Sequence, residues 1–249
     1  MKEILTTENL TKFFGDFKAV DSVSFSLHEG TITSLIGPNG AGKTTLLNML
    51  SGVIRPTHGK IYFMDKDITG LPPHKIVKMG VARGFQLLCV CNNLSTLDNV
   101  RIAVLSHMGR IRRVFSPIDR DREAYQKALE ILKTFGLDEK KDLLARDLPH
   151  GDKKLLDVAM AFALEPKLIL LDEPTSGVST SEKGKIMSTI EKVIRERGIT
   201  ALIVEHDMDV VFSYSDRILV MHEGKLIADG KPEEIKSDKK IESVLLGVG

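Results

Sequence analysis

A glycine-rich stretch, "GPNGAGKT" from Gly37 to Thr44, constrains this chain more than any other feature. It matches the pattern G-x-x-x-x-G-K-[ST] in full, follows the β-type run "TITSLIG" and precedes apolar residues at helical spacing over 46–50. The glycines let backbone N–H groups turn inward around a phosphate. A helix that begins at Lys43 adds the positive end of its dipole.

The spacing of this pattern gives each polar residue a role. Lys43 meets the β- and γ-phosphates, and the hydroxyl of Thr44 ligates Mg²⁺. A chance glycine-rich turn does not explain the strand before it and the helix after it. The sequence therefore predicts a nucleoside triphosphate site. Its loop consists of Gly37, Pro38, Asn39, Gly40, Ala41, Gly42, Lys43, Thr44 and Thr45.

An acidic strand end in "LILLDEP" supplies the second half of the chemistry. A strand that ends in Asp172 can hold the water shell of a metal, and Glu173 beyond it can polarise an attacking water. The alternative is that both residues merely cap a strand end. In combination with Lys43 they favour hydrolysis over binding alone.

The order of apolar patterns along the chain predicts the α/β class. Residues 167–173 and 200–207 are nearly continuous apolar runs, as expected of strands covered on both faces of a parallel sheet. Between 88 and 148 the apolar residues follow a helical period instead, as in 123–137, where one face carries Tyr125, Leu129, Leu132 and Phe135. Other predicted strands lie at 3–10, 20–27 and 31–37, with strand pairs at 59–68 and 217–230.

We therefore expect one α/β domain over 1–249. A mostly helical subdomain at 88–154 divides the core into 1–87 and 155–249.

Charge and hydropathy limit the partners. The 249 residues contain 35 Lys plus Arg and 34 Asp plus Glu, a net charge of +1 that argues against broad nucleic-acid binding. The basic cluster of Arg110, Arg112 and Arg113 is interpreted as a solvated face. The two cysteines, Cys89 and Cys91, predict free thiols rather than a metal site. No apolar run approaches the ~18 residues that cross a bilayer, so we expect a soluble chain whose membrane role comes through a partner.

In their order, these landmarks resemble the ATP-binding cassette ATPases along essentially the whole chain. Phe14 in "TKFFG" stands where that family stacks an aromatic ring on adenine. Gln86 in "ARGFQ" matches a glutamine that contacts the metal and the attacking water, and His206 in "IVEHD" matches a histidine that touches the γ-phosphate. Taken singly, Phe14 would be a core aromatic and His206 a strand-end residue; the joint spacing carries the resemblance. "SGVS" at 176–179 occupies the loop that meets a partner subunit.

The resemblance implies the fold of these ATPases, a P-loop NTPase core with a mostly helical subdomain and an N-terminal antiparallel β subdomain. It also implies an ATPase that uses ATP and Mg²⁺, with Glu173, His206 and Gln86 as catalytic residues and Thr44, Gln86 and Asp172 at the metal. It implies a second cassette, identical or sister, together with integral membrane permease subunits. A solute-binding protein is implied as an indirect partner, and nucleic acid is not expected as a partner. The expected location of the chain is the cytoplasmic face of the cell membrane.

Within the family, "GVARGFQLL" and the terminal "IESVLLG" resemble the cassettes of branched-chain amino-acid importers, although urea-type and lipopolysaccharide-export cassettes share much of this. A low-turnover regulatory ATP-binding module is the alternative from another class. Cassettes of DNA repair or translation carry long insertions or paired cassettes that do not appear here.

One family motif is altered. Where the family has Leu-Ser-Gly-Gly-Gln facing the γ-phosphate of the other subunit, this chain has Pro149 for the serine, His150 for the first glycine and Asp152 for the glutamine, with Gly151 retained. Proline is compatible with a first helical turn, so a helix starting near residue 150 is still predicted, with Leu155, Val158, Ala159 and Phe162 on its buried face. His150 either donates to the phosphate in place of the serine or points to solvent. Asp152 favours the helix dipole but would repel a nearby phosphate.

A second departure is Ser179, where many relatives have aspartate. The clamp between two cassettes is therefore expected to survive in weakened form, with closure that depends on the partner subunits.

Restoring the serine tests the altered motif. We expect Pro149→Ser, in a Glu173→Gln background, to tighten ATP-dependent dimerisation about ten- to hundredfold, because a hydrogen bond to a charged group contributes roughly 1.5–3 kcal/mol. Sedimentation with ATP measures the dimer, and Glu173→Gln alone is the control. Unchanged dimerisation would mean that the missing serine does not limit closure.

Overall fold

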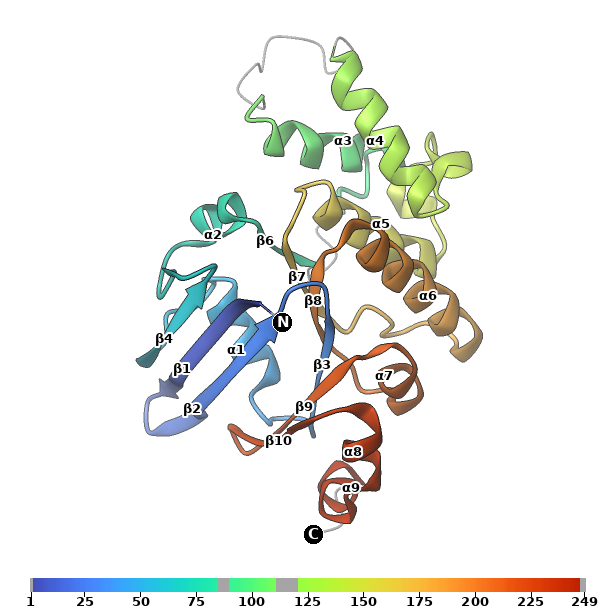
Figure 1. Ribbon diagram of the computed structural model, residues 1–249. Coiled ribbons are helices and arrows are strands. Elements are labelled where there is room, and N and C mark those ends of the chain that lie inside the picture. Colours follow the sequence, from blue (N-terminus) through green and yellow to red (C-terminus); the bar gives the residue numbers. More distant parts are fainter. Residues whose placement is uncertain (1, 85–89, 111–120, 247–249) are drawn as a thin grey trace.

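The computed structural model describes residues 2–84, 90–110 and 121–246 of the chain. Its central element is a six-stranded sheet in the order β10-β9-β3-β8-β7-β6 (Figure 1). All neighbours in this sheet are parallel except β9 and β10, which are antiparallel. The strands are β3 (Ile32–Ile36), β6 (Val81–Gly84), β7 (Leu168–Asp172), β8 (Thr200–Val204), β9 (Arg217–His222) and β10 (Lys225–Gly230).

The parallel strands are buried on both faces, as their apolar runs predict. In β7 the side chains of Ile169 and Leu171 join one core cluster, and those of Leu168 and Leu170 join the other. This alternation follows from the two-residue period of a strand. Each cluster takes every second side chain of β7, so nearly every residue of the strand is apolar and its sequence shows no alternation of apolar and polar residues.

A second, four-stranded antiparallel sheet has the order β2-β1-β4-β5. Its strands are β1 (Glu3–Phe14), β2 (Phe17–His28), β4 (His58–Phe63) and β5 (Lys66–Asp67). The hairpin between β1 and β2 turns at Gly15, whose φ of 58° is a conformation that glycine adopts without a steric cost. The predicted N-terminal antiparallel subdomain is confirmed, although β1 and β2 are both longer than the apolar runs indicate.

Most of the helices lie beside the six-stranded sheet, and the antiparallel sheet lies at an edge of the molecule (Figure 1). α3 and α4 lie together at one end, α5 and α6 pack beside β7 and β8, and the chain ends in α8 and α9. No helix in the described part is long and apolar enough to span a bilayer. The helices are α1 (Lys43–Leu50), α2 (Pro73–Met79), α3 (Thr96–His107), α4 (Arg122–Thr134), α5 (His150–Phe162), α6 (Thr180–Arg197), α7 (Met208–Tyr214), α8 (Pro232–Ser237) and α9 (Lys239–Leu246), with short 3₁₀ turns η2 (Asp138–Lys140) and η3 (Ala145–Asp147).

The buried face of α4 is shifted from the predicted one. Leu132 and Phe135 are buried as expected, but Tyr125 and Leu129 are only partly buried at the edge of the core. The helix instead buries alanine and isoleucine side chains fully or nearly so, at Ala124, Ala128 and Ile131. A prediction based on large side chains misplaces the buried face of α4, because small residues make its contacts with the core.

α5 begins at His150, so the helix predicted after the proline forms. Pro149 is its N-cap residue, with φ −54° and ψ 155°. The predicted buried stripe is confirmed: Leu155, Val158, Ala159 and Phe162 are all buried. The division of the chain at 88–154 stays a prediction.

Truncating Phe162 tests the packing of α5. Its side chain is fully buried, with its ring edge-on to Phe135 at a centroid distance of 5.3 Å. We expect Phe162→Ala to lower the free energy of unfolding by about 3–5 kcal/mol, measured in urea. The control Phe17→Ala removes the same ring from a side chain that is 65% exposed, and should change stability by less than about 0.5 kcal/mol. Equal effects of the two substitutions would contradict this packing.

Candidate active site

The phosphate loop connects β3 to α1 at the carboxyl edge of the parallel sheet. Gly37 follows the last residue of β3, and its φ of 149° leaves an added Cβ only 2.1 Å from the carbonyl oxygen of Met221. Gly42 is the N-cap of α1 at φ 99°, where a Cβ would lie 2.4 Å from the carbonyl oxygen of Ala19. The two fixed glycines of the motif are therefore required by close backbone approach as well as by conformation.

Lys43 is the first residue of α1 and is buried. Its ammonium donates to the carbonyl oxygens of Gly37 at 2.7 Å and Pro38 at 2.9 Å, which hold it against the loop. Burial lowers the pKa of Lys43, while the nearby carboxylates of Glu173 and Asp172 act in the opposite direction. The loop lysine and the acidic strand end are thus electrostatic neighbours, as the sequence predicts.

Asp172 ends β7 and is almost completely buried. Arg83 in β6 donates from its guanidinium to Oδ2 of Asp172 at 3.0 Å. Burial raises the pKa of Asp172, and Arg83 opposes that shift. The other carboxylate oxygen, Oδ1, is buried without a hydrogen-bond partner in the described part of the chain. Such an oxygen needs a ligand or water.

Glu173 and His206 form a contact between the ends of two neighbouring strands. Nε2 of His206, which follows β8, lies 2.8 Å from Oε1 of Glu173, which follows β7. Glu173 has a φ of 52°, a left-handed conformation that is unfavourable for a residue with a side chain. Backbone strain of this kind concentrates at functional sites, where the surrounding structure maintains it.

Lys43, Glu173 and His206 line one cavity of about 400 Å³, and Asp172 is not among its lining residues. That volume falls within the range of about 300–1,000 Å³ usual for ligand pockets. Phe14, which is 51% exposed, lies at the cavity with the ammonium of Lys12 at 5.2 Å from its ring centre. The cavity is lined by Phe14, Phe17, Ala19, Asn39, Gly40, Ala41, Gly42, Lys43, Thr44, Thr45, Glu173 and His206.

The residues of the altered motif lie elsewhere. Pro149, His150 and Gly151 open α5 and are not among the residues that line this cavity. The His150 ring lies against the loop after β7, with Nε2 3.1 Å from where a Cβ on Gly177 would stand. The carboxylate of Asp152 is paired with Lys140. Gln86 lies outside the described residues.

Ser179 has a local role that explains its presence. It is the N-cap of α6, and both its backbone N–H and its hydroxyl donate to the carboxylate of Glu182, at 3.2 and 2.6 Å. A serine at this position therefore stabilises the start of the helix.

Two basic residues at the site, Arg83 and Lys154, were not predicted from the sequence. Arg83 holds Asp172 and also reaches the side chains of Asn48 and Ser51, and it lies in the same "ARGFQ" stretch that contains Gln86. Lys154 donates from α5 to the hydroxyl of Ser176 at 2.9 Å and, at 3.4 Å, to the carbonyl oxygen of Glu173. Lys154 precedes Val158 by four residues and so lies on the buried side of α5. This spacing is the sequence signal from which its burial could have been predicted.

A phosphate loop opening a helix beside strand ends that carry carboxylates and a histidine is the arrangement of the P-loop nucleoside triphosphatases. The comparisons with known proteins narrow this class. The model of the family "ABC transporter" matches residues 20–176. The chain belongs to the ABC transporter family.

Curated relatives match along nearly the whole chain. One is a probable branched-chain amino acid transport ATP-binding protein, LivG, of Archaeoglobus fulgidus, at 39% identity over 98% of this chain and 96% of the relative. Another is the high-affinity branched-chain amino acid transport ATP-binding protein BraF of Pseudomonas aeruginosa, at 36% identity over 99% and 98%.

A solved structure, the ADP conformation of an ATP-binding cassette of an ABC transporter, superposes with a TM-score of 0.89 at 36% identity over 99% of this chain and 100% of the other. The fold is thus that of the ABC ATPases, and the family supports ATP hydrolysis by a transporter subunit.

The Arg83–Asp172 pair can be tested by a double-mutant cycle. We expect Arg83→Gln to destabilise the fold by about 3–5 kcal/mol, because it leaves the charge of Asp172 buried and unpaired. Adding Asp172→Asn removes that charge, so urea unfolding should give a coupling of about 1–3 kcal/mol. The exposed pair Arg146–Asp147, at 3.8 Å, is the matched control and should show a coupling near zero. Additive effects at Arg83 and Asp172 would refute the pairing.

Proposed function

We propose that this chain hydrolyses ATP and thereby powers the import of branched-chain amino acids, or a related small polar solute, through membrane permease subunits. The observation that carries the proposal is the contact of Glu173 with His206 beside the loop of Lys43. The names of the relatives that match along the whole chain support the transported class.

The phosphates of ATP bind to the backbone N–H groups of the loop and to Lys43, and Phe14 stacks on the adenine. The residues present also fit Mg²⁺, which prefers oxygen ligands: Oδ1 of Asp172 lacks a partner in the described part, and the hydroxyl of Thr44 follows Lys43. When bound, Mg²⁺ neutralises charge on the phosphate oxygens. Gln86 is assigned to the metal and the water by the resemblance alone.

Glu173 acts as the general base that orients the attacking water and accepts its proton. His206 fixes the carboxylate through the 2.8 Å contact and meets the γ-phosphate when the nucleotide is bound. Because Arg83 holds one oxygen of Asp172, that carboxylate keeps a fixed orientation while Glu173 next to it does the proton transfer.

The second cassette, identical or sister, contributes the start of α5 to the nucleotide of its partner. Pro149, His150 and Gly151 stand there, where the N-terminal end of the helix dipole attracts a phosphate. Lys140 pairs with Asp152 and so reduces the repulsion that its carboxylate would exert on that phosphate. Lys154 links this end of α5 to the backbone of Glu173. The same contact therefore connects the helix that closes on the partner's nucleotide with the residue that activates water.

A transporter subunit of this kind acts at the cytoplasmic face of the cell membrane, bound to integral permease subunits and indirectly to a solute-binding protein. Urea-type and lipopolysaccharide-export cassettes are less favoured, because the matching relatives carry amino-acid transport names. The altered start of α5 is the observation behind one other alternative, a regulatory module that binds ATP and turns over slowly, and the matching relatives do not favour it either.

Glu173→Gln separates hydrolysis from binding. The steady-state ATPase rate with Mg²⁺ should fall at least about 100-fold, because a general base contributes roughly 10²–10⁴-fold, while ATP binding is retained. The matched control Glu196→Gln changes a carboxylate on the exposed surface of α6 and should leave the rate unchanged. A wild-type chain that binds ATP without turnover would establish the regulatory module instead.

Uptake of leucine, but not urea, should be lost in cells that carry only Glu173→Gln.

A further inference from the structure

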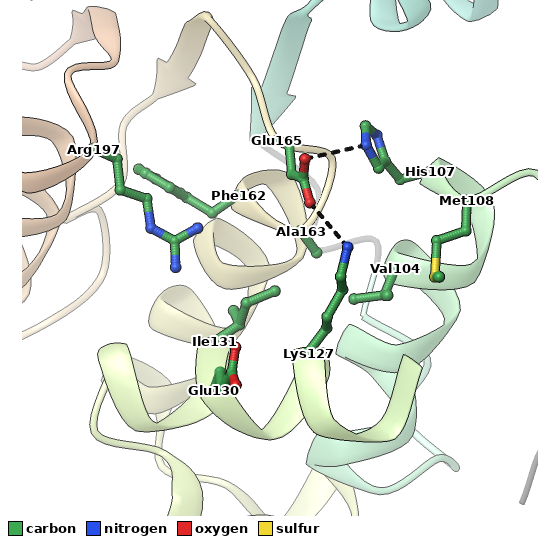
Figure 2. A pocket seen from close by; sticks show the side chains of 10 residues that line it. All are labelled: Val104, His107, Met108, Lys127, Glu130, Ile131, Phe162, Ala163, Glu165 and Arg197. Atoms are coloured by element: carbon green, nitrogen blue, oxygen red, sulfur yellow. Dashed lines mark ion pairs between the residues drawn. The ribbon is translucent and has the colours of Figure 1, made fainter. Parts of the chain in front are cut away.

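A second cavity, of about 130 Å³, lies far along the chain from the phosphate loop, between α3, α4, α5 and α6 (Figure 2). An apolar cavity of roughly 150 Å³ accommodates benzene, so this one suits a small metabolite and is too small for a nucleotide. Its buried wall is apolar and consists of Val104, Ile131, Phe162 and Ala163. The wall therefore fits a short branched aliphatic group.

Three helices end at this cavity. α3 ends at His107, α5 at Phe162 and α6 at Arg197, and all three residues line it. The C-terminal end of a helix carries a partial negative charge. Backbone N–H groups beyond each of these ends already bond carbonyl oxygens of the last turn, among them those of Leu105, Phe162 and Ile194, so the choice of ligand depends on the side chains.

The charged side chains around the cavity balance one another. Glu165 lies between His107 and Lys127, with each of the two ion-pair distances 3.5 Å (Figure 2). Glu130 and Arg197, both exposed, also line the cavity, and within the described part no ion pair or hydrogen bond joins either side chain to another residue. One carboxylate and one guanidinium are thus available to a ligand that carries both charges.

We propose that this cavity binds an α-amino acid with a short branched aliphatic side chain. The side chain packs on Ile131 and Phe162, the ammonium group meets Glu130, and the carboxylate meets Arg197. A phosphate would need surplus cations, and a purely apolar ligand would leave both charged groups unused. The link between this ligand and the transported solute rests on the proposed function, whereas binding itself does not.

Titration of the isolated full chain with L-valine tests the site without permease or ATP hydrolysis. We expect saturable binding with a millimolar or tighter Kd. Three analogues should each bind at least about tenfold more weakly than valine. They are isovalerate, which lacks the ammonium group, isobutylamine, which lacks the carboxylate, and glycine, which lacks the side chain. Absence of saturable binding overturns the proposal, as does equal binding of valine and any one of the three analogues.

Substitutions locate the binding. Glu130→Gln and Arg197→Gln should each weaken valine binding about tenfold, and Lys133→Gln, on the exposed side of α4 and outside the cavity lining, should not. Unchanged ATP binding at the phosphate loop shows that each variant is folded. Valine binding that is insensitive to both substitutions overturns the assignment to this cavity. If cells that carry the wild-type chain and its permease subunits take up no leucine, while the isolated chain binds valine, the proposed cargo is refuted and the cavity site stands.

Discussion

The parallel register of β3, β8 and β7 is the constraint on which the site depends. Because parallel strands point their carboxyl ends to the same edge, the loop after β3, His206 after β8 and Asp172 at the end of β7 meet there. These residues lie far apart in the chain, from Lys43 to His206, and only this pairing joins them. The two-sided burial of the strands fixes the register, since a one-residue slip would exchange the contents of the two core clusters.

The sequence predicts most of this arrangement because its strongest patterns are local. The loop from Gly37 to Thr44 and the runs of β7 and β8 each carry their own periodicity or spacing, and the structure bears them out. What escaped prediction depends on contacts between distant segments. Arg83 acquires its meaning only when β6 lies beside β7, and the face of α4 depends on Ala124 and Ala128, whose small side chains give a weak periodic pattern.

The altered start of α5 is accommodated by its surroundings. Pro149 provides an N-cap with no side-chain donor, and the carboxylate that replaces the family glutamine, Asp152, is paired with Lys140. His150 lies against Gly177, in the loop that follows β7. The departures therefore remove a donor without leaving an unpaired acid near the expected phosphate position, which is compatible with a working but weaker clamp.

The two ends of α5 serve different sites. Its 13 residues span about 20 Å, with the clamp residues at the N-terminal end and the proposed amino-acid cavity at the C-terminal end. Coupling between sites requires an element that both of them bias. α5 contacts both sites, because Lys154 in its second turn joins it to Glu173 while Phe162 forms part of the cavity wall. A ligand in the cavity therefore alters nucleotide affinity only to the extent that it shifts α5 relative to β7, and by reciprocity nucleotide binding would alter the affinity of that ligand by the same factor.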